Sequence, residues 1–495
     1  MTRRPALRLS TLRSDLPASL VVFLVALPLC VGVAVASGVP AELGLVTGIV
    51  GGLVTGMLPG SSLQVSGPAA GLTVLVFAAV QDHGLAALGV ITAVAGLLQL
   101  AMGAARLGRL FRAISVSVVQ GMLAGIGLVL IAGQLYALAD AKGPAGGPAK
   151  IAGIPGLIAD VAGDSRALAA AAIGAGTIAV LVLWPRLPAR VRVVPAPLAA
   201  VAAATAVTAL FDLPVARVEV AGLAGVIDLP GASDLAALGS VGVLGTALAF
   251  ALIASAESLF SAAAVDRLHD GPRTDYDREL LAQGVGNTLC GLLGALPMTA
   301  VIVRSAANVQ AGARTKASRV LHGVWLLLFA ALFPAALSAI PLAALAGVLV
   351  HAGGKLVPVR TLRPLWRADR GEAAILAVTA IAIVVTNLLE GVLLGLLLAV
   401  LKSAWDTSHL QVAVTELPDG PVRVTLHGNA TFLRLPRLLE TLEGLEGLPA
   451  DRPVRLDLSG LRHLDHACRS ALELWQERHN RSGSAELLGL PAAAA

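Results

Sequence analysis

A succession of apolar stretches, each close to the length of a membrane-spanning helix, dominates this 495-residue chain. About 20 mostly apolar residues cross the hydrocarbon core of a bilayer as a helix. We predict such spans at 17–37, 41–59, 67–81, 84–103, 113–136, 167–184, 194–211, 240–263, 278–295, 298–310, 318–339, 341–357, 372–388 and 389–405. There are about fourteen such segments, and they predict an α-helical polytopic membrane protein.

The composition agrees with this class of protein. Hydrophobic residues make up 56% of the chain and charged residues only 14%, whereas soluble domains carry about 25% charged residues. Much of the surface must therefore face lipid. The 53 glycines are small residues at which membrane helices approach closely. The arginines at the N-terminus precede an apolar run that continues past signal-peptide length, so we expect no cleaved signal.

The loop charges predict the orientation, because basic residues mark the cytoplasmic side of a membrane protein. Fourteen spans with the N-terminal arginines inside place the basic clusters at 106–112, 186–192, 314–319 and 360–370 on that same side. The acidic 212–239 segment falls outside. We therefore expect a multi-pass protein of the cell inner (plasma) membrane with both termini in the cytoplasm. The basic pI follows from these loops, so we expect no nucleic acid as a partner.

Two of the predicted spans, 67–81 and 298–310, are too short for ordinary crossings. Each begins beside a proline, Pro68 or Pro297, and proline is tolerated in the first turn of a helix. Each is also the third span of a set of seven. Matching interrupted segments indicate an inverted repeat, here about 14–212 and 240–407, with the substrate site between the two halves. Two bent helices without function are the structural alternative.

The composition changes after Trp405. Strand-like stretches at 412–414, 422–426 and 454–458 alternate with helical ones at 432–444 and 467–479. This alternation predicts a small α/β domain at 408–495 and leaves 1–407 as the transmembrane domain. The α/β domain follows the last span directly, so we expect it in the cytoplasm.

The segments that lead into the two short helices predict an anion site. A helix N-terminus has free N–H groups and about half a positive charge. Two such ends that meet inside the membrane would bind an anion. The candidate substrate-binding residues are Ser66, Ala69, Ala70, Thr299, Ala300, Val301 and Arg304. Arg304 would add positive potential behind the anion; an arginine that snorkels near a helix end is the alternative.

Glu257 is the only acid in the predicted span 240–263. A lone carboxylate inside the membrane is a functional candidate by default. It is either protonated by desolvation or holds a cation together with Ser261 one turn further on. Glu257 and Ser261 are therefore the candidate coupling-ion residues, and Na⁺ at this pair is the only metal ion we consider. A hydrogen bond between helices is the alternative, and the same role is expected of Gln283 and Asn287.

These motifs resemble those of the SulP family of anion transporters. The residues that carry the resemblance are 25–30, 66–68, 257–259, 279–284, Asn287, Pro297, Arg304, Ser305 and Asn308. They follow the order of the family, and the resemblance covers nearly the whole chain. It implies a seven-plus-seven inverted repeat with core and gate domains, elevator-like transport and a homodimer.

What the resemblance implies about the coupling ion depends on the subgroup of the family to which this chain is most similar. The first 80 residues look most like bacterial members proposed to carry bicarbonate or sulfate. In the sodium-dependent cyanobacterial bicarbonate transporters, an acid in the eighth span and a hydroxyl one turn later bind sodium, and Glu257 and Ser261 match these positions. This chain has Glu where they have Asp, and Ala69 where they have a substrate-binding threonine. Other bacterial members have glutamate here and are proton-coupled, so Na⁺ and H⁺ both stay open.

The C-terminal domain resembles STAS domains. Residues 454–460 resemble the central strand and the turn that follows it. In related anti-sigma-factor antagonists, the motif matching 465–467 carries a phosphorylated serine, whereas this chain has His466. We therefore expect a role in assembly, or in regulation by a partner, without a phosphoserine switch.

Together these features predict secondary active transport of a small inorganic anion, bicarbonate or sulfate, coupled to Na⁺ or H⁺. The alternatives are a dicarboxylate or nucleobase symporter of the same fold, an anion channel, or a receptor that signals through the STAS domain. We expect no enzyme and no cofactor, because no nucleophile–base pair appears. The three cysteines, Cys30, Cys290 and Cys468, lack metal-ligand spacing.

Overall fold

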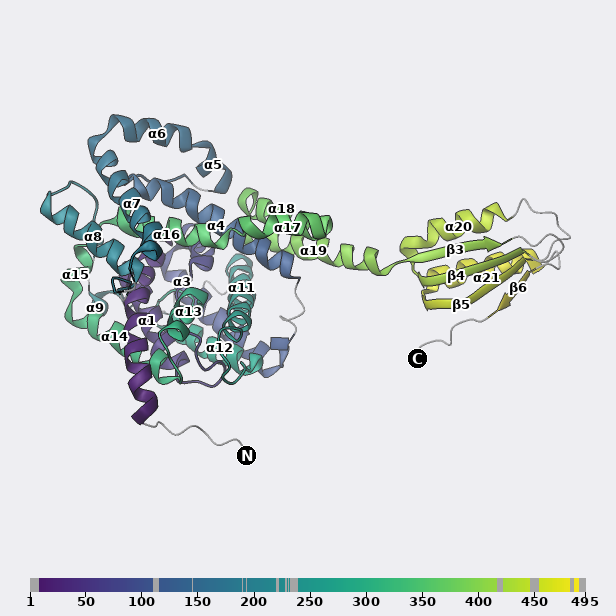
Figure 1. Ribbon diagram of the computed structural model, residues 1–495, viewed down its shortest axis with the longest axis horizontal. Coiled ribbons are helices and arrows are strands. Elements are labelled where there is room, and N and C mark those ends of the chain that lie inside the picture. Colours follow the sequence, from purple (N-terminus) through teal and green to yellow (C-terminus); the bar gives the residue numbers. More distant parts are fainter. Residues whose placement is uncertain are drawn as a thin grey trace. The chain divides into compact units, whose positions relative to one another are not determined.

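The chain folds into two compact units, Met1–Gly395 and Leu396–Ala495 (Figure 1). The computed structural model describes residues 9–109, 115–144, 146–188, 190–192, 194–219, 222–227, 229, 231, 239–415, 422–445, 454–480 and 485–488. The first unit is helical, and the second contains a β-sheet with helices. The helix α19 contains the boundary between the units and ends at Thr407, where the sequence predicts the end of the transmembrane domain.

The first unit contains the following helices, of which the last, α19, continues past the end of the unit. They are α1 (Leu9–Ala36), α2 (Ala41–Val50), α3 (Thr73–Ala104), α4 (Val116–Leu138), α5 (Gly147–Ala152), α6 (Ile154–Gly163), α7 (Ser165–Leu183), α8 (Ala196–Leu210), α9 (Leu223–Val226), α11 (Val241–Val265), α12 (Tyr276–Leu292), α13 (Ile302–Gln310), α14 (Ala317–Leu332), α15 (Pro334–Ser338), α16 (Leu342–Leu356), α17 (Val359–Ala368), α18 (Arg370–Val385) and α19 (Leu388–Thr407). A helix bonds all its interior backbone groups internally, which is what an apolar solvent requires.

Seven helical stretches of the described chain are long and apolar enough to cross a membrane. They are Arg13–Ala36, Ala70–Ala104, Val116–Leu138, Ser165–Arg186, Val241–Val265, Leu342–Ala368 and Leu388–Thr407. Shorter apolar helices lie at Ala41–Thr55, Ile154–Gly163, Ala196–Leu210 and Ala317–Leu332. The predicted α-helical membrane fold is therefore confirmed, while the number of crossings stays a prediction.

The helices pack as two groups. In one group, α3 packs against α11 and α12, and α1 packs against α2, α13 and α14. In the other, α4 packs against α16 and α18, and α7 packs against α8 and α16. The helices α1, α8 and α16 contact one another and join the two groups. Segments from both halves of the sequence thus contribute to each group.

Two predicted helix starts were placed too early. A 3₁₀ turn at Ala70–Leu72 precedes α3, and α13 begins only at Ile302. Pro68 and Pro297 therefore lie in the extended segments before these helices, and the prediction that each helix begins beside its proline was wrong. The helix α3 contains residues 73–81 of the predicted span 67–81 and the whole of the predicted span 84–103. Gly84 separates them, because its φ of 83° breaks the helical path.

Helices also form where no span was predicted. The short helices α5 and α6 lie between the predicted spans 113–136 and 167–184. The helix α17 lies in what was predicted as a basic loop at 360–370. These helices are too short, or too rich in arginine, to be recognised as membrane spans by the length of an apolar run.

The second unit is a four-stranded sheet that carries α20 (Leu435–Gly444) and α21 (His466–Asn480). Its strands are β3 (Leu410–Thr415), β4 (Val422–Ala430), β5 (Val454–Leu464) and β6 (Ala485–Leu488), in the order β3-β4-β5-β6. Strands β3 and β4 pair antiparallel, and the other neighbours pair parallel. Each predicted strand and helix of this region lies within or overlaps an observed element.

Alternation of buried and exposed residues explains this sheet. Along β4, Val422, Val424 and Leu426 are buried, with more exposed residues between them. They pack in one hydrophobic cluster with helix residues such as Leu442 and Cys468. The Asp465 carboxylate accepts a hydrogen bond of 2.8 Å from the Cys468 amide and so caps the start of α21.

Candidate functional site

The two interrupted segments meet as a pair of short strands. Strand β1 (Ser66–Gly67) pairs antiparallel with β2 (Thr299–Ala300), with Ser66 opposite Ala300 and Gly67 opposite Thr299. The Val301 amide extends the pairing by donating to the Val65 carbonyl at 2.9 Å. Each strand leads within a few residues into a helix, so the starts of α3 and α13 lie on either side of this strand crossing. The prediction that the two segments come together is confirmed.

One face of α12 holds the strand crossing in place. Gln283 Nε2 donates to Ser66 Oγ at 2.7 Å, which fixes β1. Asn287 Oδ1 accepts from the Met298 amide at 2.7 Å, and Asn287 Nδ2 donates to the Met298 carbonyl at 3.1 Å, which fixes the segment before β2. Gln283 and Asn287 are buried. The predicted interhelical hydrogen bond is confirmed for Asn287, which bonds Gln99 of α3, whereas Gln283 bonds β1 and Glu279 of its own helix.

Two polar residues of α13 bind the segment before β1. The Val65 amide donates to Ser305 Oγ at 2.9 Å, and Asn308 Nδ2 donates to the Leu63 carbonyl at 2.9 Å. Both side chains are fully buried. Because buried backbone groups without partners cost free energy, these bonds stabilise an extended segment inside an apolar bundle.

Arg304, also on α13, is completely buried, with 0% of its surface exposed. Its Nη2 donates to the Pro68 carbonyl at 3.2 Å. Among the described residues, its Nε and Nη1 have no hydrogen-bond partner. A side chain in place of Gly67 would collide with Nη1, so the guanidinium lies directly against β1. Arg304 therefore does not snorkel to a surface; its charge lies at the strand crossing.

Glu257 approaches the same place from α11. This helix is tied to the strand crossing by Ser258, whose Oγ accepts from the Ala300 amide at 3.2 Å and whose carbonyl accepts from Gln64 Nε2 at 2.8 Å. The carboxylate of Glu257 lies against Gly71 in the turn before α3. Its Oε2 is buried and lacks a hydrogen-bond partner among the described residues. Ser261, the other candidate coupling residue, is buried one turn further along α11.

The remaining candidate residues all lie at or next to the strand crossing. Ser66, Ala69, Thr299 and Ala300 are buried, and Ala70 and Val301 are partly exposed. Thr299 Oγ1 donates to the carbonyl of Ala300 at 3.4 Å. Ser66, Ala69, Thr299 and Ala300 belong to extended backbone ahead of the helices rather than to their first turns.

Sequence reasoning missed several residues that shape this site. Gln99 of α3 accepts from Asn287 Nδ2 at 2.7 Å and donates to Ser255 Oγ at 3.1 Å, which links three helices. Gln64 and Ser258 join α11 to the segment before β1. In the sequence, each of these residues is visible only as a polar side chain inside or beside an apolar run. Such a pattern does not identify the residue to which that side chain bonds.

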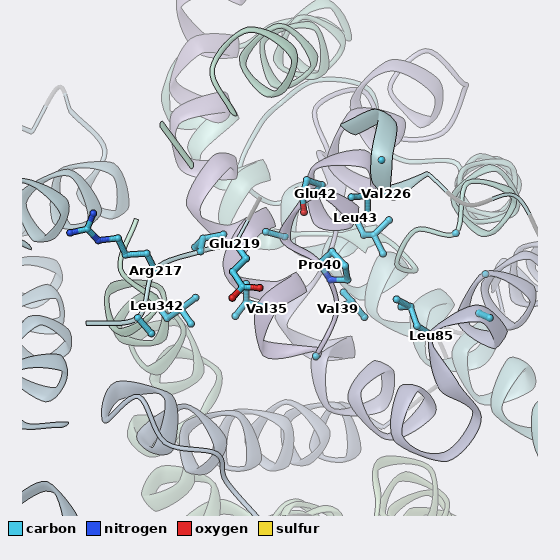
Figure 2. Close-up of a pocket in the computed structure, with 18 residues that line it drawn as sticks. Val35, Val39, Pro40, Glu42, Leu43, Leu85, Arg217, Glu219, Val226 and Leu342 are labelled. Atoms are coloured by element: carbon cyan, nitrogen blue, oxygen red, sulfur yellow. The ribbon is translucent and has the colours of Figure 1, made fainter. Parts of the chain in front are cut away.

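A large cavity lies elsewhere in this unit. It has a volume of about 1020 Å³ and lies between the turn joining α1 to α2, part of α3 and the 216–219 segment (Figure 2). Glu42, Arg217 and Glu219 are its charged lining residues. None of the candidate substrate or coupling residues lines it, so this cavity is not assigned to the site.

The fold and the site together define a polytopic membrane transporter whose two interrupted helices meet inside the helix bundle. Residues 12–379 match the sulfate permease family, and the chain belongs to that family. The predicted SulP resemblance is confirmed. The protein is accordingly a membrane anion transporter by family, not an enzyme.

Relatives of known description agree with this assignment. YvdB of Bacillus subtilis, a candidate sulfate transporter, is 29% identical over 79% of this chain and 73% of its own length. The bicarbonate transporter BicA of Picosynechococcus is 25% identical over 84% of this chain and 74% of its own. The murine solute carrier 26 member A9 anion transporter, solved in the inward-facing state, superposes with a TM-score of 0.81 at 16% identity. That match covers 98% of this chain and 86% of the other, and it establishes a shared fold.

Proposed function

We propose that this protein carries bicarbonate or sulfate across the cytoplasmic membrane as a secondary transporter coupled to Na⁺ or H⁺. The observation that carries the proposal is Arg304, a fully buried arginine with two guanidinium nitrogens unpartnered among the described residues. A buried charge without a partner costs several kcal/mol, about the range for broken buried ion pairs. An anion at the strand crossing would offset that cost.

The proposed site binds the anion chiefly through backbone. The N–H groups at the starts of α3 and α13 point their partial positive charge toward the strand crossing. Arg304 adds a full positive charge behind β1. Such a site recognises charge and size, and the small side chains of Ala69, Ala70 and Ala300 leave the backbone accessible to the ligand. Inorganic anions such as sulfate and bicarbonate suit it better than a nucleobase, which needs hydrogen bonds to its ring edges.

We assign coupling to Glu257 and Ser261. A bound anion and an ionised Glu257 would repel each other across the start of α3. Either a proton on Glu257 or a Na⁺ ion held by Glu257 and Ser261 removes that repulsion. The anion and the cation therefore bind together, which is the basis of symport.

The movement we propose is elevator-like. The group containing α1, α2, α3, α11, α12, α13 and α14 holds the whole strand crossing, with Glu257 and Arg304, so this group would carry the anion. The group of α4, α7, α8, α16 and α18 would form the gate domain. In this proposal the transporter is a homodimer in the inner membrane with both termini in the cytoplasm. Cysteines introduced in the 212–239 segment should react with an external reagent, and those at 360–370 should not.

We further propose that the second unit is a STAS domain that takes part in assembly or binds a regulatory partner. Its parallel β4–β5 pair and the helix start at Asp465 support this proposal. At the motif position the chain has His466, an exposed residue with no hydroxyl to phosphorylate. Removing residues 408–495 should lower assembly or activity by degree while the membrane unit still folds.

The experiment that tests the proposed function is a panel of radiolabelled anions in proteoliposomes, with Na⁺ and H⁺ gradients imposed separately. We expect saturable accumulation of bicarbonate or sulfate under one of the two gradients. Uptake of a dicarboxylate or nucleobase alone would favour those symporters, and large unitary currents would indicate a channel. Failure of every substrate in tightly sealed vesicles would overturn the transport proposal and favour a receptor.

A further inference from the structure

The helix α17 segregates its side chains by chemistry. At about 100° per residue, Arg360, Arg363 and Arg367 fall within one arc of about 60°. Val359, Leu362 and Trp366 fall within the adjoining arc of about 60°. A strip of three arginines therefore runs beside a strip of three large apolar residues along the whole helix.

Neither strip is covered by the rest of the protein. Within the described part of the chain, α17 contributes no buried residue. Val359 is 71% exposed, Trp366 52% and Leu362 38%. No described residue forms an ion pair with any of the three arginines. A medium with an apolar part and an anionic part would suit these two adjoining strips of side chains.

The place of α17 in the chain supplies such a medium. The apolar helix α16 ends at Leu356, and Pro358 separates it from α17. Asp369 then starts α18 by accepting a hydrogen bond of 3.0 Å from the Glu372 amide. Figure 1 shows α17 beside α18, and the two helices are in contact. The helix α17 connects two apolar helices of a membrane unit, and its three arginines make deep insertion costly, so a position at the membrane surface suits both strips.

We propose that α17 is an interfacial helix that binds the phosphate groups of anionic membrane lipids. Val359, Leu362 and Trp366 enter the outer part of the acyl-chain region, where tryptophan is favoured. Arg360, Arg363 and Arg367 bind lipid phosphates above them, since the planar guanidinium fork matches a phosphate in a bidentate way. The occupant is a lipid of the bilayer rather than a soluble anion, because only a lipid places its phosphate directly above an apolar layer.

The test uses the fluorescence of Trp366 in the full-length protein reconstituted into vesicles of phosphatidylglycerol and phosphatidylcholine. One lipid at a time carries bromine on its acyl chains, which quenches nearby tryptophan. The difference between the wild type and Trp366→Phe isolates the Trp366 signal from the other tryptophans. We expect brominated phosphatidylglycerol to quench Trp366 more strongly than brominated phosphatidylcholine at equal mole fraction.

The variant with Arg360→Gln, Arg363→Gln and Arg367→Gln should lose this preference while Trp366 stays quenched by both lipids. The relative association of phosphatidylglycerol should fall by about fivefold for each arginine removed. The matched control carries Arg423→Gln, Arg437→Gln and Arg462→Gln, which removes the same charge from exposed positions of the second unit. It should keep the wild-type preference.

Three results would overturn the proposal. A Trp366 signal that neither brominated lipid quenches would place α17 outside the interface. Equal quenching by both lipids in the wild type would exclude selection of anionic headgroups. A preference that millimolar inorganic phosphate removes would assign the arginines to a soluble anion instead of a lipid.

Discussion

The carboxylate of Glu257 occupies the space that a side chain at residue 71 would need. A Cβ added to Gly71 would lie 2.5 Å from Oε1 and 2.7 Å from Oε2 of Glu257. Gly71 belongs to the turn Ala70–Leu72 that precedes α3. The acid that we assign to coupling therefore touches the helix start that we assign to anion binding, and the absence of a side chain at residue 71 permits this contact.

Substituting Gly71 with alanine should displace the Glu257 carboxyl group. The new methyl group meets the flexible end of a side chain rather than backbone, so the fold should survive. Overpacking typically costs about 1–3 kcal/mol, and we expect gradient-driven accumulation to fall roughly tenfold or more. Radiolabelled uptake in proteoliposomes measures this effect. Gly245→Ala is the control, because no described atom lies within 4 Å of a Cβ there; equal losses in the two variants would contradict the proposed contact.

Replacing Arg304 with alanine should weaken anion binding and leave the fold intact. The change removes the buried positive charge at β1, and losing a hydrogen bond to a charged group costs about 1.5–3 kcal/mol. We expect the KM for the transported anion to rise roughly tenfold to a hundredfold. Arg304→Lys should restore part of the affinity, because it returns the charge without the planar fork. An unchanged KM in a correctly folded Arg304→Ala protein would give this residue a structural role only.

The sequence sufficed to predict the helical membrane fold, because apolar runs of membrane length are a local signal. It also sufficed to predict that 64–71 and 294–301 belong together, since both precede interrupted spans in corresponding positions. The strands β1 and β2 were not predicted. A two-residue strand has no periodicity, and its pairing depends on a partner more than two hundred residues away along the chain.

The contacts that position the site could not be predicted. Asn287 bonds Met298 and Gln99 through geometry that arises only once α3 and α12 pack. Gly71 looks like any small residue until α11 brings Glu257 against it. The helix α17 lies where the sequence predicts a basic loop, because its arginines interrupt any apolar run of membrane length. The sequence signal for α17 is that its arginines and its large apolar residues fall on different sides of a helix.

The bonds of Asn287 to the Met298 backbone predict a stability effect. Asn287→Ala leaves the amide and carbonyl of Met298 buried without their partner. Leaving buried polar groups unsatisfied costs about 1–3 kcal/mol each, so we expect a clear fall in the thermal midpoint of the detergent-solubilised protein. Thr288→Ala is the control on the same helix, since among the described residues the Thr288 hydroxyl bonds the Gly284 carbonyl of α12 and no other group. Equal shifts in both variants would contradict this assignment.

Cys468 of the second unit should be unreactive at ordinary pH. Burial, followed by the nearby Asp465 carboxylate, raises the pKa of the Cys468 thiol to about 12. The folded state therefore favours the neutral thiol. This contribution to stability is complete below about pH 8.5, the pKa of a free thiol, and is lost as the pH rises toward 12.

At pH 8 the thiolate fraction of Cys468 is roughly a thousandfold below that of an exposed cysteine. Alkylation by iodoacetamide, followed by peptide mass spectrometry to distinguish Cys468 from Cys30 and Cys290, should show a correspondingly slow reaction. The rate should reach that of a free cysteine once the protein is unfolded in denaturant. Rapid labelling of the native protein at pH 8 would contradict the buried position of this thiol.

The measurement that tests the central claim most directly is uphill accumulation of the transported anion by the wild type and by Glu257→Gln. The substitution keeps the shape of the side chain at the start of α3 and removes its ability to bind a proton or to charge-balance Na⁺. Both proteins are reconstituted at equal density, and a Na⁺ or an H⁺ gradient is imposed alone. We predict that the wild type accumulates the anion under one gradient, whereas Glu257→Gln loses accumulation and retains some downhill exchange. Accumulation that persists unchanged in Glu257→Gln would contradict the account.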